Sequence, residues 1–296
     1  MNPTLQKLGY DEQDRVVIIH ADDIGMCQAT LPAIADLFDF GLVSSAAVMA
    51  PCPWFLQAAA FCRAHPSIDM GVHLTVNAEW KTYRWGPLST RDPASGLLDD
   101  QGYFPHSPST VEQQADPGAV AVELREQVKR ALQAGIDPTH VDAHMGTISR
   151  APFLQSYVDV ALEHGLPLPF IGVDEAGLHG RVITSQIVAY GSQLGQQLAA
   201  RGVPLIDAVL GLPLNDPVDQ IGAAKKILAN LQPGLTVLLL HPAQDTPELR
   251  TMTPDWPSRV ANYEACMSHE LRAYVQQSGI QVIGYRPLRE LLRAAA

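Results

Sequence analysis

Residues 16–49 read VVIIHADDIGMCQATLPAIADLFDFGLVSSAAVM, and this segment contains one complete β–α–β unit. An apolar strand pattern at Val16–His20 is followed by a helical pattern at Thr30–Phe40 and a second apolar run at Ser45–Met49. Gly41 marks the end of the helix, since glycine adopts the left-handed conformation at low cost. A helix that links two short buried strands makes those strands parallel.

The same alternation continues along the chain. Further strands are predicted at Met70–Leu74, His140–His144, Leu168–Ile171, Leu205–Leu210, Thr236–Leu240 and Gln281–Tyr285. Further helices are predicted at Phe55–Ala64, Gly118–Ala134, Phe153–His164, Ser185–Arg201, Val218–Asn230, Arg259–Ser278 and Pro287–Arg293. About seven strand–helix units favour a single-domain α/β barrel over residues 15–296, closed or nearly closed, after an N-terminal extension at residues 1–14. A doubly wound open sheet is the alternative.

Two long segments interrupt the pattern. Asn77–Asp116 is rich in Pro, Ser and Gly, and Pro242–Ser258 contains four prolines. Long loops in a compact domain are often functional lids, and the aromatic residues in both segments favour that interpretation. The alternative is that these aromatic residues pin the loops to the body of the protein.

The composition excludes several classes of protein. The 296 residues are 47% hydrophobic and carry a formal net charge of −11, so the chain has enough apolar surface to fold and lacks the basic excess of a nucleic-acid binder. The four cysteines form no CxxC pair, and we expect them to stay reduced. No apolar leader or membrane-length run is visible, so we expect a cytoplasmic protein without membrane contact.

Acidic residues and histidines gather where the predicted strands end. In parallel α/β folds the carboxyl ends of the strands meet at one rim, and that rim carries the active site. Four different strands bring such residues to the rim: His20, Asp22, Asp23, His73, His140, Asp142, His144 and His241.

The spacing of three of these residues sharpens the hypothesis. His140, Asp142 and His144 alternate, so they project from one face of a strand. Asp22 and Asp23 are adjacent and need a local bend, which Gly25 permits, if both are to face the site. Two histidines with one carboxylate suit a catalytic divalent metal, with Zn²⁺ plausible and Mg²⁺ or Mn²⁺ still open. Taken singly, an Asp-Asp pair is more often a solvated turn, and a lone histidine is more often a core residue.

These residues also carry a family resemblance. The chain resembles the YdjC-like (ChbG/HpnK) carbohydrate deacetylases in five segments. These are His20-Ala-Asp-Asp-Ile-Gly25, Gly41-Leu-Val-Ser-Ser45, Gly71-Val-His-Leu74, Pro138-Thr-His-Val-Asp-Ala-His144 and Leu240-His-Pro242. Two C-terminal stretches, Arg259…Tyr263-Glu264 and Ile283-Gly-Tyr-Arg286, also resemble the family. The residue before Ala-Asp-Asp is usually Asn in that family and is His20 here. Family members often have further histidines after His144, where this chain has Met145-Gly146-Thr147.

The resemblance implies an irregular (β/α) barrel, TIM-barrel-like and related to the polysaccharide deacetylases. It implies a divalent metal held by Asp23, His73 and His144, with Asp22 as catalytic base and His241 as catalytic acid. It also implies hydrolysis of an N-acetyl group from an amino sugar or a short N-acetylated oligosaccharide.

Further roles follow from the residues themselves. We expect His140 and Asp142 to orient a ligand imidazole. A sugar ring would meet aromatic faces and two polar anchors: Trp80, Tyr83, Trp85 and Trp256, with Arg84 and Arg259. The alternatives are a barrel hydrolase of another amide or ester and a sugar-binding protein without catalysis. A homodimer is left open.

Overall fold

The computed structural model describes residues 2–171 and 185–295. The strands are β1 (Arg15–Ile24), β2 (Ser45–Val48), β3 (Met70–Leu74), β4 (Val141–Ala143), β5 (Ala208–Gly211), β6 (Gly234–Leu240) and β7 (Gln281–Val282). The helices are α1 (Pro3–Lys7), α2 (Thr30–Phe40), α3 (Phe55–Ala64), α4 (Pro108–Gln114), α5 (Pro117–Gln133), α6 (Ala151–Glu163), α7 (Ser185–Ala200), α8 (Gln220–Ala229), α9 (Pro247–Met252), α10 (Trp256–Cys266), α11 (His269–Gln277) and α12 (Arg286–Ala295). Short 3-10 helices lie at Pro93–Ser95 and His144–Ser149.

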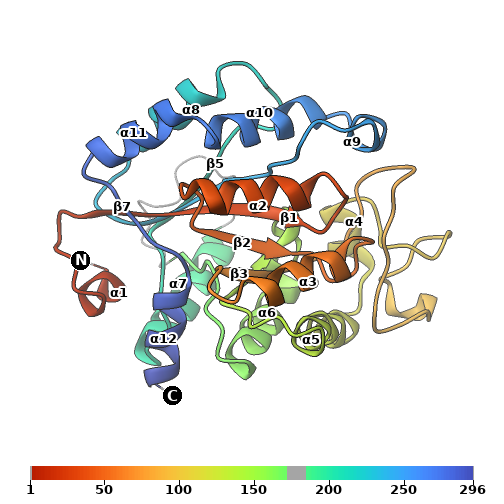
Figure 1. Cartoon of the computed structure of the whole chain (residues 1–296). Helices are drawn as coiled ribbons and strands as arrows, with labels where there is room; N and C mark the ends of the chain where they lie inside the picture. The colour runs from red at the N-terminus through yellow and green to blue at the C-terminus, as the bar shows by residue number, and fades with distance from the viewer. Residues whose placement is uncertain (1, 172–184, 296) are drawn as a thin grey trace.

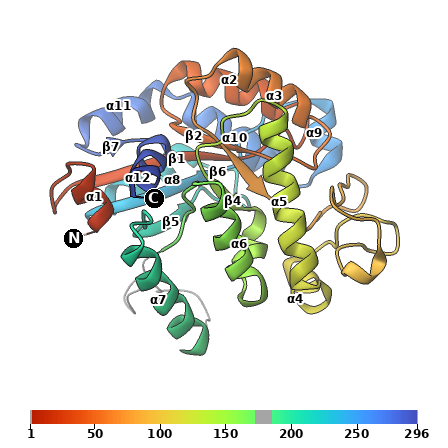
Figure 2. The same ribbon diagram turned by 90° about the horizontal axis from the view of Figure 1, so that it is seen from below.

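The strands form one parallel sheet that curls into a half-barrel with helices packed around it (Figures 1 and 2). The strand order is β4-β3-β2-β1-β6-β5, and β7 pairs with the amino half of β1. The α/β barrel prediction is therefore confirmed as a half-barrel, and within residues 2–171 and 185–295 no strand ladder joins β4 to β5. In the part of the chain that the structure describes, no helix is both long and apolar enough to span a bilayer.

The predicted strand Leu168–Ile171 is wrong and leaves the gap in the barrel. Backbone there makes an isolated bridge between Ile171 and Ile206. It also accepts two hydrogen bonds, from the Ile206 amide to the Phe170 carbonyl and from the Val141 amide to the Pro167 carbonyl, both at 3.0 Å. Pro167 and Pro169 have no amide proton, so this segment cannot supply a continuous ladder.

One predicted helix is wrong because it is divided in the structure. The helix expected over Arg259–Ser278 is two helices, α10 and α11, because the Ser268 side chain accepts a hydrogen bond from the Leu271 amide and starts a new helix. The structure also adds α1, α4 and α9, which lie within segments expected to be irregular.

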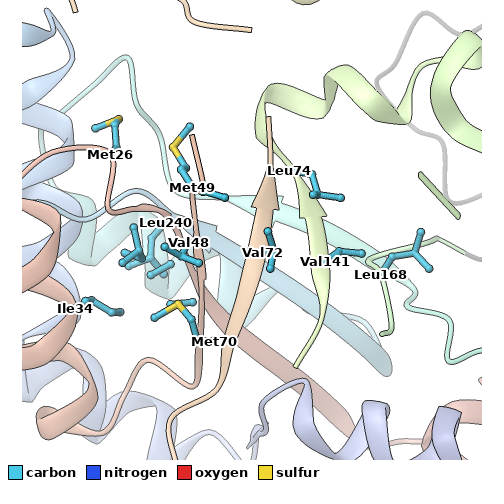
Figure 3. Packing of buried hydrophobic residues seen from close by; sticks show 14 of the residues in the cluster. Met26, Ile34, Val48, Met49, Met70, Val72, Leu74, Val141, Leu168 and Leu240 are labelled. Carbon is cyan, nitrogen blue, oxygen red and sulfur yellow. The ribbon is translucent and has the colours of Figure 1, made fainter. Parts of the chain in front are cut away.

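Alternate residues of β1 face two different cores. Val17 and Ile19 belong to the large cluster that packs against the surrounding helices, part of which is shown in Figure 3. Val16 and Ile18 face the barrel interior, where they pack with Leu5 of α1. His20 and Asp22 lie on the same face of β1 as Val16 and Ile18, so their side chains point into the interior at the carboxyl end of the strand.

The two ends of the barrel have different roles. Figure 1 shows the long segment between β3 and α4 beyond the carboxyl ends of the strands, while both chain termini lie at the opposite end. The rim with the predicted site therefore faces the loops.

Candidate metal centre

A break in β1 allows two adjacent aspartates to enter the site. Asp23 has a φ of 64°, and the pairing of β1 with β2 shifts between Ala21 and Ile24. The bend therefore lies at Asp23 itself, with Gly25 (φ 81°) just after it. A left-handed conformation at a residue with a side chain costs about 1–3 kcal/mol, and such strain is typical of functional sites.

Three side-chain atoms from three strand ends converge on one point. Asp23 Oδ1 lies 3.3 Å from His73 Nε2 and 3.1 Å from His144 Nδ1, and the two ring nitrogens are 3.3 Å apart. Ligand atoms about 2.0–2.1 Å from a tetrahedral zinc ion are about 3.3 Å apart, so the spacing and chemistry of these donors fit a divalent metal. The structure thus brings together the three residues predicted to hold it.

Each imidazole of this trio is oriented by a carboxylate on its other nitrogen. Asp142 Oδ1 is 2.8 Å from His73 Nδ1, and Glu79 Oε2 is 3.0 Å from His144 Nε2. Such partners fix the tautomer and the orientation of a metal-binding histidine. Sequence reasoning placed Asp142 in this role but missed Glu79, which lies in the long loop after β3.

Asp22 lies between two histidines. Its Oδ1 is 3.0 Å from His20 Nε2, in an ion-pair contact without hydrogen-bond alignment, and its Oδ2 is 3.5 Å from His241 Nε2. The backbone of His241 is fixed by a hydrogen bond from its amide to Asn262 Oδ1. His241 Nδ1 has no partner among the described residues.

His140 lies one layer deeper than predicted. Its ring stacks on Tyr285 at 3.8 Å between centroids and meets the edge of His20 at 4.9 Å. Its Nδ1 is 3.0 Å from Thr139 Oγ1. His140 therefore supports His20 by packing, while Asp142 alone of the predicted pair bonds a ligand imidazole.

Burial and charge set the pKa values of the trio. Burial alone would raise the pKa of Asp23, but Arg259 and the two histidines outweigh it and hold that pKa well below its usual range. Burial alone would lower the pKa of His144, but Glu79 and Asp23 raise it to about 9. A metal needs a neutral imidazole, so a metal bound at this trio would displace a proton from His144, and its affinity would rise with pH.

The loop residues expected to contact a sugar have other partners. Arg84 donates to Asp99 Oδ2 at 2.7 Å and to the Phe104 carbonyl, and its side chain is only 5% exposed. Trp85 Nε1 donates to the Asn77 carbonyl at 2.9 Å. Arg84 and Trp85 therefore hold the loop together, and Tyr83, which donates to the Met26 carbonyl at 2.6 Å, ties the loop to the barrel.

Arg259 links this loop to the trio. Its guanidinium donates to Asp23 Oδ2 at 2.8 Å and to Asp255 Oδ1 at 2.9 Å, and it lies 5.5 Å from the centre of the Trp80 ring. Trp256 is half-buried under Arg250. Arg259 thus serves as the partner of a candidate metal ligand, a position that composition and spacing did not indicate.

Comparisons with known proteins identify the family of this chain. Residues 16–277 match the family described as YdjC-like protein. A carbohydrate deacetylase of Thermus thermophilus is 32% identical, with 97% of this chain and 98% of the relative covered. One from Thermoanaerobacter pseudethanolicus is 22% identical, with 93% and 100% covered. The crystal structure of a candidate cellobiose-phosphate cleavage protein from Enterococcus faecalis V583 shares the fold, with a TM-score of 0.77, 24% identity, and 93% and 99% covered. This chain therefore belongs to the YdjC-like family.

Proposed function

We propose that the chain is a metal-dependent carbohydrate deacetylase that removes the N-acetyl group from an amino sugar or a short N-acetylated oligosaccharide. The observation that carries the proposal is the convergence of Asp23 Oδ1, His73 Nε2 and His144 Nδ1 within 3.3 Å of one another. The names of the curated relatives support the reaction and the class of substrate.

Asp23, His73 and His144 would hold the ion, with Zn²⁺ or Mg²⁺ as the candidates. When bound, the ion polarises the acetyl carbonyl and lowers the pKa of a water molecule. Asp22 takes a proton from the attacking water as general base. These two roles are supported by the position of Asp22 next to the trio, with its Oδ2 3.5 Å from His241 Nε2.

His241 passes that proton to the leaving amine. Burial lowers the pKa of His241, so the ring is neutral at rest and must first gain a proton. Asp22, 3.5 Å away, becomes a proton source within reach after it has deprotonated water. The proton lost by water thus ends on the amine, and acetate is released. His241 is also the most exposed of these groups, at 22%, so the substrate enters on its side.

The substrate contacts, the cellular setting and the assembly are part of the proposal. The Trp80 ring packs against Arg259, which donates a hydrogen bond to Asp23. Of the predicted aromatic contacts, Trp80 is the one that we propose for the sugar ring. Four free, buried cysteines support a reducing, cytoplasmic setting. Sedimentation of the purified protein will decide between a monomer and a homodimer.

Acetate release from N-acetylated mono- and oligosaccharides, with and without a chelator, tests the proposal. Asp23→Ala and His144→Ala should lose bound metal and activity while remaining folded, and His241→Ala should keep metal but lose turnover. His269→Ala, at the start of α11, is the matched histidine control. Full metal content in either of the first two variants refutes the ligand assignment.

A further inference from the structure

His20 lies directly beneath Asp22, in the barrel interior, and the mechanism above does not use it. Its side chain is 1% exposed and contacts two carboxylates and one hydroxyl. We propose that His20 is a positioning residue whose ring is an imidazolium at neutral pH and holds Asp22 and Asp142 side by side under the metal ligands. This inference rests on the proposed function for its catalytic consequence.

The proton on His20 Nδ1 follows from the groups below it. Asp69 accepts hydrogen bonds from Ser45 Oγ at 3.3 Å, from Thr139 Oγ1, and from the Arg286 amide at 2.8 Å. A serine hydroxyl has one proton, and here that proton points to Asp69. The oxygen of Ser45 must then accept from His20 Nδ1, which is 3.0 Å away.

The other ring nitrogen faces only negative groups. His20 Nε2 lies 2.9 Å from Asp142 Oδ2 and 3.0 Å from Asp22 Oδ1. If Nε2 carried no proton, its lone pair would face two buried carboxylates, and neither negative charge would have a positive partner. Burying unpaired charges in this way is costly. Nε2 therefore also carries a proton, and the ring is a cation.

The energetic balance agrees with this assignment. Burial would lower the pKa of His20, but the hydrogen bonds and charges of Asp142 and Asp22 raise it to about 9. The groups packed around the ring are three carboxylates, Asp22, Asp142 and the more distant Asp69, and the neutral rings of His140 and Tyr285. Burial lowers the pKa of His140 well below its usual range, so this neighbour brings no second charge.

A cation at this position couples two parts of the mechanism. One oxygen of Asp142 binds His20 and the other binds the ligand His73, while Asp22 is the general base. Removing the imidazolium would leave Asp22 and Asp142 free to repel each other. The general base would then lose its fixed position, although the three metal ligands would remain.

The charge of His20 can be measured without any enzyme assay. In ¹⁵N-labelled, zinc-loaded protein, the imidazole signals at pH 7.5 are recorded, and the His20 signal is identified by its loss in His20→Asn. We expect both ring nitrogens at the chemical shifts of a protonated imidazolium. A neutral tautomer would overturn the proposal, whatever the activity.

Kinetics then test the positioning role. In His20→Asn we expect full metal content, KM within about twofold, and kcat lower by about 10- to 100-fold. Ser45→Ala removes only the acceptor of the His20 Nδ1 proton and should lower kcat about tenfold. This variant tests the positioning role if His20→Asn does not fold. The control is His65→Asn, since this exposed imidazole lies at the end of α3 and bonds only its own helix.

Two results separate this inference from the proposed function. Unchanged kcat in both variants, with an active wild type, overturns the positioning role. A wild type that releases no acetate overturns the proposed function, and the imidazole signals then decide the charge of His20 on their own.

Discussion

Gly71→Ala should destabilise the protein because the new methyl group would meet His140. A Cβ at position 71 would lie 2.5 Å from His140 Nε2 and 2.6 Å from Nδ1, closer than packed side chains approach. His140 cannot move away freely, because Tyr285 stacks on its ring and Thr139 contacts Nδ1. Gly71 itself has no positive φ, so the effect comes from crowding alone.

The expected loss is about 2–4 kcal/mol in the free energy of unfolding. Overpacking contributes about 1–3 kcal/mol, and the displaced ring gives up roughly another 1 kcal/mol of hydrogen bonding and stacking. For a chain of this size the midpoint of thermal unfolding should fall by roughly 5–10 °C. Urea titration followed by circular dichroism measures the loss directly.

Two further variants make the test decisive. Gly211→Ala is the matched control, since it also lies in a parallel strand but its Cβ would have no neighbour closer than 3.8 Å. In a His140→Ala background, Gly71→Ala should cost much less, because the clashing ring is gone. If Gly71→Ala is as stable as Gly211→Ala, or if its cost is the same with and without His140, the reasoning is wrong.

Three more predictions concern the site and its loop. Glu79→Gln should weaken metal binding about tenfold, measured by chelator competition, because a neutral amide orients His144 less well; unchanged affinity would show that the contact is incidental. Arg84→Ala should cost about 2 kcal/mol and expose residues 75–107 to protease, because it leaves Asp99 without its buried partner; a loop as resistant as wild type contradicts this. The raised pKa of His20 predicts a stability contribution that is complete below about pH 6.5 and is lost as pH rises through about 9. Unfolding of wild type and His20→Asn between pH 6 and 10 should therefore converge at high pH, and parallel curves would refute the assignment.

Much of the barrel could be predicted because burial on both faces produces strongly apolar strands. The helices α2 and α3 have the predicted bounds, since each is followed by a residue that ends helices, Gly41 or Pro66. The predictions are wrong where the chemistry of single residues overrides the periodicity of the apolar residues. Pro167 and Pro169 remove amide protons from a strand-like segment, and Ser268 starts a new helix inside an amphipathic run.

The convergence of the site residues could be predicted because their strands are parallel and because side chains alternate between the two faces of each strand. His140, Asp142 and His144 do share the inner face, and Asp23 and His73 meet them from other strands. Partners outside the strands could not be found this way, since Glu79 lies in a loop and Arg259 lies in α10. The spacing of residues within a strand carries no information about which residues of other segments contact that strand.

The stack of His140 on Tyr285 has a consequence for synthesis of the chain. Tyr285 closes the floor beneath His20 and His140, and the Arg286 amide binds Asp69 in the same layer. The strands that bring in the candidate metal ligands are translated early, whereas this floor is translated after every other element except α12. A nascent chain can thus assemble most of the sheet while its polar interior is still open below. In ribosome-bound intermediates the rings of His20 and His140 should accordingly stay open to solvent until Tyr285 has emerged.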